Sequence, residues 1–139
     1  MSDITLARAE MVSLLTPIAP VRTGRAALET TSATLPVIVL WSTGETRAED
    51  QGYGVIAYTR SLTLEYKITA SAAYDDDLDA VLRNVRLALK PPMGGSPIQH
   101  AVAVRETSAR FFAPDLSQGG SQIAVLQMTF EIDYLERLS

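Results

Sequence analysis

Two stretches with an apolar residue at every second position, 61–70 and 123–134, constrain the fold of this chain most. Successive side chains of a β-strand point to opposite faces of the sheet, so the alternation predicts strands with one buried face. The apolar positions are Leu62, Leu64, Tyr66, Ile68 and Ala70 in the first stretch, and Ala124, Leu126, Met128, Phe130, Ile132 and Tyr134 in the second. Both strands therefore require a second layer to cover that face.

Four further segments complete the expected architecture. The near-continuous apolar run "LPVIVLW", 35–41, predicts a central strand covered on both faces, and 97–112 predicts another strand. Apolar residues recur at helical spacing in 2–15 and in 75–90. The order αββαββ predicts an α+β fold, a single two-layer domain of residues 1–139 with a four-stranded mixed β-sheet and two α-helices on one face.

Long loops are expected in the segments that join these elements. Residues 20–34, 42–54 and 113–121 are rich in glycine or in small and polar residues.

The apolar stripe of the second helix consists of Leu78, Val81, Leu82, Val85 and Leu89. Together these patterns predict a rigid core with several exposed connections.

Charge and composition exclude several classes of protein. The 139 residues carry a formal net charge of −4, which argues against an electrostatic nucleic-acid binder. Without cysteine there is no disulfide, thiolate metal site or cysteine nucleophile. No run approaches the roughly 18 apolar residues of a membrane span, and the start lacks the positive charge of a signal peptide. We expect a soluble protein with no membrane partner.

The acidic cluster of Asp75, Asp76, Asp77 and Asp79 admits two interpretations. A hard-cation site needs several oxygens that converge, whereas successive aspartates on a helix point about 100° apart. The cluster opens directly into a leucine-rich helical stripe, so we expect Asp75 to be the N-cap and the next two aspartates to favour the positive end of the helix dipole. The alternative is a metal-dependent hydrolase or nuclease that uses these four carboxylates.

The other candidate sites are weaker. His100 is the only histidine, and no spacing supplies the acid and nucleophile that a catalytic base needs, so we expect an ordinary strand residue. The "MGG" turn at 93–95 follows a helix and precedes a strand, the reverse of a phosphate-binding loop. The sequence thus predicts no catalytic residue, no cofactor and no metal, and favours a protein that is not an enzyme.

Arginine and aromatic residues lie together in "RETSARFF", 105–112. This composition is typical of core phenylalanines beside solvated arginines, of interface anchors, or of a surface on which nucleic-acid bases stack. The acidic total disfavours nucleic acid. Trp41 ends an apolar strand and has two readings, packing within the sheet or contact with a partner.

The order of these motifs resembles the tail terminator proteins of long-tailed bacteriophages, also called tail completion or minor tail U-like proteins. The matching positions are the strand start Leu35–Pro36, the Asp-rich helix start with Leu78, and the closing strand with Phe130, Ile132 and Tyr134. The resemblance spans about residues 2–135. The chain departs from it at 20–33 and in 96–112.

The resemblance implies a structural virion protein at the head-proximal end of the tail. It would form a homo-oligomeric ring, typically a hexamer, on the tail tube, stop tube polymerisation and present the surface that joins the head. The implied partners are the tail tube protein and a head completion or neck protein, and genomic DNA would pass through the ring without specific binding. The alternative in the same setting is another neck or head-completion connector.

Polar contacts in such a ring are expected at arginines outside the helical stripes. The chain has ten arginines and two lysines, and the planar guanidinium pairs bidentately with carboxylates. The predicted subunit or tube interface consists of Arg22, Arg25, Arg47, Arg105 and Arg110, with Glu45, Glu49 and Asp50 as acidic partners.

Overall fold

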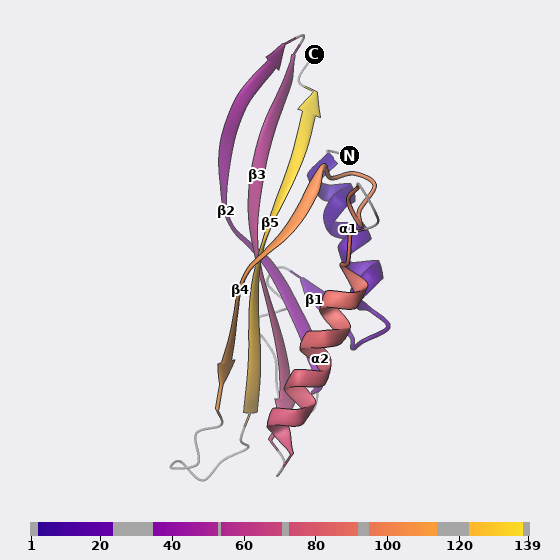
Figure 1. The fold of residues 1–139 in the computed structure, drawn as a ribbon, viewed down its shortest axis with the longest axis vertical. Helices are drawn as coiled ribbons and strands as arrows, with labels where there is room; N and C mark the ends of the chain where they lie inside the picture. The colour runs from indigo at the N-terminus through magenta and orange to yellow at the C-terminus, as the bar shows by residue number, and fades with distance from the viewer. Residues whose placement is uncertain are drawn as a thin grey trace.

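A twisted β-sheet with two helices packed against one face forms the core of the protein in the computed structural model (Figure 1). The structure describes residues 3–23, 35–52, 54–70, 73–91, 95–113 and 123–137, with side chains except at 48–52. The elements are α1 (Asp3–Leu15), β1 (Val21–Thr23), β2 (Val37–Gly52), β3 (Val55–Thr69), α2 (Tyr74–Ala88), β4 (Ala103–Phe112) and β5 (Ile123–Arg137).

In the described part of the chain the sheet has five strands in the order β1-β2-β3-β5-β4, so the prediction of four strands was wrong. β1 runs parallel to β2, and all other neighbours are antiparallel. The extra strand, β1, pairs Val21, Arg22 and Thr23 with Ile38, Val39 and Leu40. A three-residue strand is too short to show a periodicity in the sequence. Residues 21–23 form a strand because they pair with β2.

The segment 42–54, predicted as a loop, instead forms most of a long hairpin between β2 and β3. Its glycines and charges are typical of loops, but the backbone pairs with β3 as far as Gly52 opposite Val55. The ladder shifts register three times, and such irregularities accommodate residues that do not fit a regular strand. Gly54, with a φ of 75°, supplies the left-handed backbone of the turn.

The other two predicted loops are described only in part. Residues 21–23 of the first form β1, and 24–34 lie outside the described residues. Residue 113 follows β4, while 114–122 also lie outside the described part.

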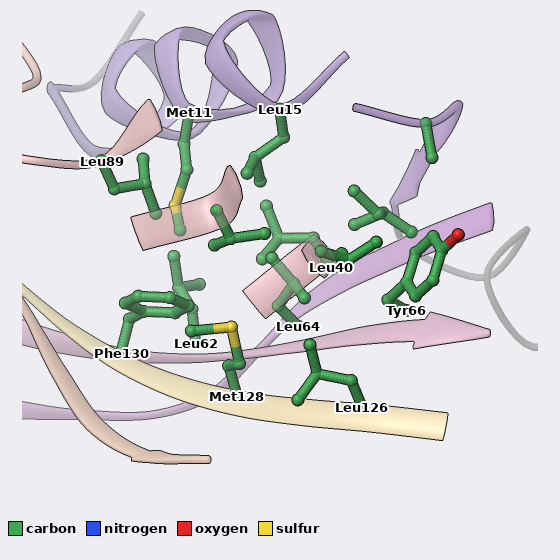
Figure 2. Packing of buried hydrophobic residues seen from close by; sticks show 14 of the residues in the cluster. Met11, Leu15, Leu40, Leu62, Leu64, Tyr66, Leu89, Leu126, Met128 and Phe130 are labelled. Carbon is green, nitrogen blue, oxygen red and sulfur yellow. The ribbon is translucent and has the colours of Figure 1, made fainter. Parts of the chain in front are cut away.

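The predicted buried faces of β3 and β5 are confirmed, but Thr63, predicted on the opposite polar face, is also buried. Leu62, Leu64, Tyr66 and Ile68 are buried, as are all six predicted apolar positions of β5, whereas Ala70 is half-buried beyond the end of β3. Figure 2 shows Met11 and Leu15 of α1 directed toward the side chains of this face. From α2, Leu78, Val81 and Val85 are buried, followed by Leu89, but Leu82 is only partly buried at the margin.

The first half of β2 is covered on both faces, as predicted. Ile38 and Leu40 join the main core, while Val37 and Val39 form a second buried cluster on the opposite face. Trp41 packs against this second cluster, which supports its reading as a residue of the sheet packing. Four consecutive buried residues require cover on both faces of the strand, because successive side chains point to opposite faces.

The two ends of the molecule differ. At one end the β2–β3 hairpin and the end of β5 project beyond the helices, and at the other lie the last residues of β4 and the start of α2 (Figure 1). The strands thus carry surfaces at opposite ends of one continuous sheet.

Neither described helix is long and apolar enough to cross a membrane.

Candidate assembly surfaces

The predicted interface residues fall into three separate places. Glu45 and Arg47 lie on the projecting part of β2, Arg22 lies on β1, and Arg105 and Arg110 lie on β4. Arg25 is outside the described residues. Glu49 and Asp50 belong to β2, but their side chains are not described. The structure therefore does not gather the set into one site.

Glu45 is engaged within its own chain. Arg60 Nε donates to Glu45 Oε1 at 2.9 Å, and Arg60 Nη1 reaches Ser42 Oγ at 3.1 Å. The Tyr134 hydroxyl also donates to Glu45 Oε1. Burial raises the pKa of Tyr134 well above its ordinary value, and the Glu45 carboxylate adds a smaller increase. Tyr58 stacks on Tyr134 with ring centroids 5.6 Å apart, so the network stiffens the base of the hairpin.

Arg47 lies further along the hairpin, opposite Tyr58 in the ladder, and its side chain is exposed. No ion pair of Arg47 with another described residue is found. Its guanidinium is thus available to a carboxylate from outside this part of the chain.

Arg105 is held by two carboxylates of the neighbouring strand. Its Nη2 donates to Glu131 Oε2 at 2.9 Å and to Asp133 Oδ1 at 3.0 Å, and Nη1 donates to Asp133 Oδ2. These bonds from Arg105 hold the pKa of Asp133 below its ordinary value, with support from the Thr59 hydroxyl. Arg105 therefore links β4 to β5. To bind a neighbouring subunit, as predicted, it has to release Glu131 and Asp133 first.

The last residues of β4 form an exposed patch of one cation and two aromatic rings. Arg110 is exposed, and no hydrogen bond or ion pair links its side chain to a described residue. Phe111 and Phe112 are 46% and 44% exposed, so their reading as core residues was wrong. The reason is position, because they lie on an edge strand at the end of the sheet, where α2 does not cover them. Exposed aromatics beside arginine are typical of interface anchors.

The ion pair that joins α2 to β4 was not predicted. Arg86 of α2 binds Glu106 of β4 bidentately, with Nε–Oε1 at 2.8 Å and Nη2–Oε2 at 2.7 Å. This pair raises the pKa of Arg86. The residues are 20 positions apart on different elements, so no helical or strand spacing in the sequence indicates their contact.

His100 lies in a turn before β4, so its predicted place in a strand was wrong. Glu10 of α1 accepts the backbone N–H groups of Gln99 and His100 at 2.7 and 3.0 Å, and its Oε1 also contacts His100 Nδ1. Partial burial of Glu10 opposes its ionisation, but the hydrogen bonds from His100 and Gln99 outweigh burial and lower the Glu10 pKa. Glu10 thereby fastens the turn to α1.

The four aspartates of the acidic cluster are all exposed. The helix begins at Tyr74 with Ala73 as N-cap and no side-chain capping bond, so the prediction of Asp75 as N-cap was wrong by two residues. Asp75, Asp76 and Asp77 lie instead in the first turn, where the helix dipole favours them. Among the described residues, no three histidine, aspartate or glutamate side chains are placed to share a metal ion.

No family model matches the sequence, and no curated protein matches it. The functional interpretation therefore depends on the resemblance of the motif order and on the surfaces described above. Of these, the projecting hairpin and the Arg110–Phe112 end of β4 carry exposed groups at opposite ends of the sheet.

Proposed function

We propose that the protein is a structural virion protein of the tail terminator type. In this proposal its subunits form a ring, with six subunits as in the proteins it resembles, on the head-proximal end of the tail tube. The ring stops polymerisation of the tube and presents the surface that joins the head. The observation that carries the proposal is the pair of unlike exposed surfaces at the two ends of one sheet.

A closed ring of identical subunits needs two different patches that are complementary to each other. The hairpin supplies polar groups that include Arg47, and the far end of β4 supplies Arg110, Phe111 and Phe112. β4 also pairs with only one described strand, so its second edge is available for pairing with another chain. These features support head-to-tail assembly of subunits through the sheet ends.

The net charge of the chain supports a role as a conduit. Glu131 and Asp133 on the open face of the sheet are paired with Arg105, and the chain as a whole has a net charge of −4. Phosphate contacts from lysine and arginine dominate nucleic-acid affinity, so a mildly acidic ring lets DNA pass without retention. The proposed partners are thus the tail tube protein and a head completion or neck protein, and no cofactor is needed.

Electron microscopy of purified protein mixed with tail tubes tests the proposal. We expect a ring on one end of each tube, and no further growth when tube protein is added. Arg110→Glu should reduce capping, while Arg83→Glu, an exposed control on α2, should not. Rings that bind only the head-side connector would assign the protein to the neck instead, and failure to bind either end would refute a role in joining.

A further inference from the structure

A cavity of about 500 Å³ lies between α1 and the sheet, beside the point where β1 ends. Its walls include Ala9 and Val12 of α1 and Leu40 and Trp41 of β2. The only cation among its described lining residues is Arg8. Thr5, Thr23 and Ser42 also line it, so the cavity has both apolar and hydroxyl walls and a single guanidinium.

Arg8 Nε is buried and has no hydrogen-bond acceptor. No carboxylate of the described residues forms an ion pair with Arg8. A buried donor without a partner is costly, and the cost falls when a carboxylate occupies the space in front of the guanidinium. An acidic group with a short apolar stem fits such a cavity best.

The exposed carboxylates of this chain differ in their availability. Glu45, Glu106, Glu131 and Asp133 are already bound to arginines within the chain. In contrast, the carboxylates of Asp75, Asp76, Asp77 and Asp79 at the start of α2 are exposed and form no ion pair with any described residue. Charge complementarity thus relates the buried, unpaired Arg8 to these exposed carboxylates.

We propose that the Arg8 cavity receives an aspartate from the start of α2 of a second copy of this chain. The start of α2 lies away from α1 within one subunit, so the two features meet only between subunits (Figure 1). The contact joins different patches of the two copies and propagates in one direction, as ring closure requires. The inference rests on the ring assembly proposed above and names one of its subunit contacts.

The absence of cysteine permits a direct test by disulfide cross-linking. Ala9→Cys places a thiol on the cavity rim in one preparation, and Asp76→Cys places one at the helix start in another. After mixing and mild oxidation, in solution and on tail tubes, we expect a mixed cross-linked dimer. Asn84→Cys, exposed about two turns further along α2, is the matched control and should react several-fold less.

A second variant tests the guanidinium itself. Arg8→Gln in the Ala9→Cys chain should lower the cross-linking yield several-fold, and Arg83→Gln in the same chain should leave it unchanged. Circular dichroism and melting temperature verify that each variant is folded.

The outcomes separate this contact from the proposed function. Tubes capped by rings that give no cross-link above the Asn84→Cys control would overturn the cavity contact and leave the terminator function standing. A protein that neither self-associates nor caps tubes would refute both. If acetate or glutarate raises the melting temperature in an Arg8-dependent manner while no cross-link forms, the cavity binds a free carboxylate and the second-copy contact is wrong.

Discussion

Tyr134 of β5 donates a hydrogen bond to Glu45 of β2 across the intervening strand β3. The two residues are 89 positions apart. The Glu45 carboxylate also accepts a hydrogen bond from Arg60 of β3, so this one group connects three strands. This contact lies on the β2–β3 hairpin, where Glu45 is opposite Arg60 in the ladder. It makes the hairpin a rigid extension of the core.

Removal of the Tyr134 hydroxyl should weaken the sheet at this point. Tyr134 is 1% exposed, so Tyr134→Phe should lower the free energy of unfolding by about 1–3 kcal/mol, the cost of a lost bond to a charged group. Urea unfolding measures the change. Tyr58→Phe is the control, because no hydrogen bond of the Tyr58 hydroxyl to a described residue is found. Equal effects of both changes would contradict the network.

The same tyrosine should make the protein less stable in alkali. Its pKa is higher in the folded than in the unfolded chain, so the folded state binds the proton more tightly. The resulting stability is complete below the unfolded pKa of about 10 and declines as pH rises above it. Unfolding measured between about pH 9 and pH 11 should show this decline, and Tyr134→Phe should reduce its slope.

Substitutions in the core should distinguish buried from marginal leucines. Leu126→Ala removes a fully buried side chain and should cost about 2–5 kcal/mol. Leu82→Ala should cost clearly less, because Leu82 is only partly buried at the edge of the α2 stripe. Thermal and urea unfolding of both variants measure the difference. An equal cost would mean that Leu82 packs more deeply than the structure shows.

Asp75 should contribute through the helix dipole and not through capping. Asp75→Ala should therefore cost less than about 1 kcal/mol, because the side chain makes no capping bond and alanine is a good helix former. Addition of Mg²⁺, Mn²⁺ or Ca²⁺ should leave the melting temperature unchanged. A metal-dependent rise that Asp76→Ala abolishes would revive the hydrolase interpretation.

Glu10 should stabilise the protein against acid. Its pKa is lowered from 4.5 on folding, so its contribution is present above that pH and is lost as pH falls through the lower folded value. Glu10→Gln should reduce the dependence of stability on pH below about pH 4.5, measured by urea midpoints. Part of the dependence should remain, because the pKa of Asp133 is also lowered.

The two arginines of β4 should respond differently to charge reversal. Arg105→Glu removes two pairs and places like charges together, so it should cost about 1–2 kcal/mol of stability. Arg110→Glu should leave unfolding nearly unchanged and reduce capping of tail tubes. Urea unfolding and electron microscopy separate the two effects. Loss of stability in both variants would mean that Arg110 also has a structural partner.

Periodicity by itself determined the helices and the buried faces of β3 and β5. The spacing of Ala7, Met11 and Leu15, and the alternation from Leu62 to Ile68 and from Ala124 to Tyr134, depend on local geometry that any window of the sequence displays. For this reason the two helices, the mixed sheet and the doubly covered start of β2 could be predicted, whereas the prediction of four strands was wrong.

Only the tertiary structure decided the features that depend on a partner distant in sequence. β1 exists because Val21 pairs with Ile38, and the polar segment 42–52 is a strand because β3 lies beside it. Phe111 is exposed because it lies near the end of the edge strand β4, although a Phe-Phe pair in a strand is typical of a core. Pairing and coverage come from non-local contacts, which local periodicity does not encode.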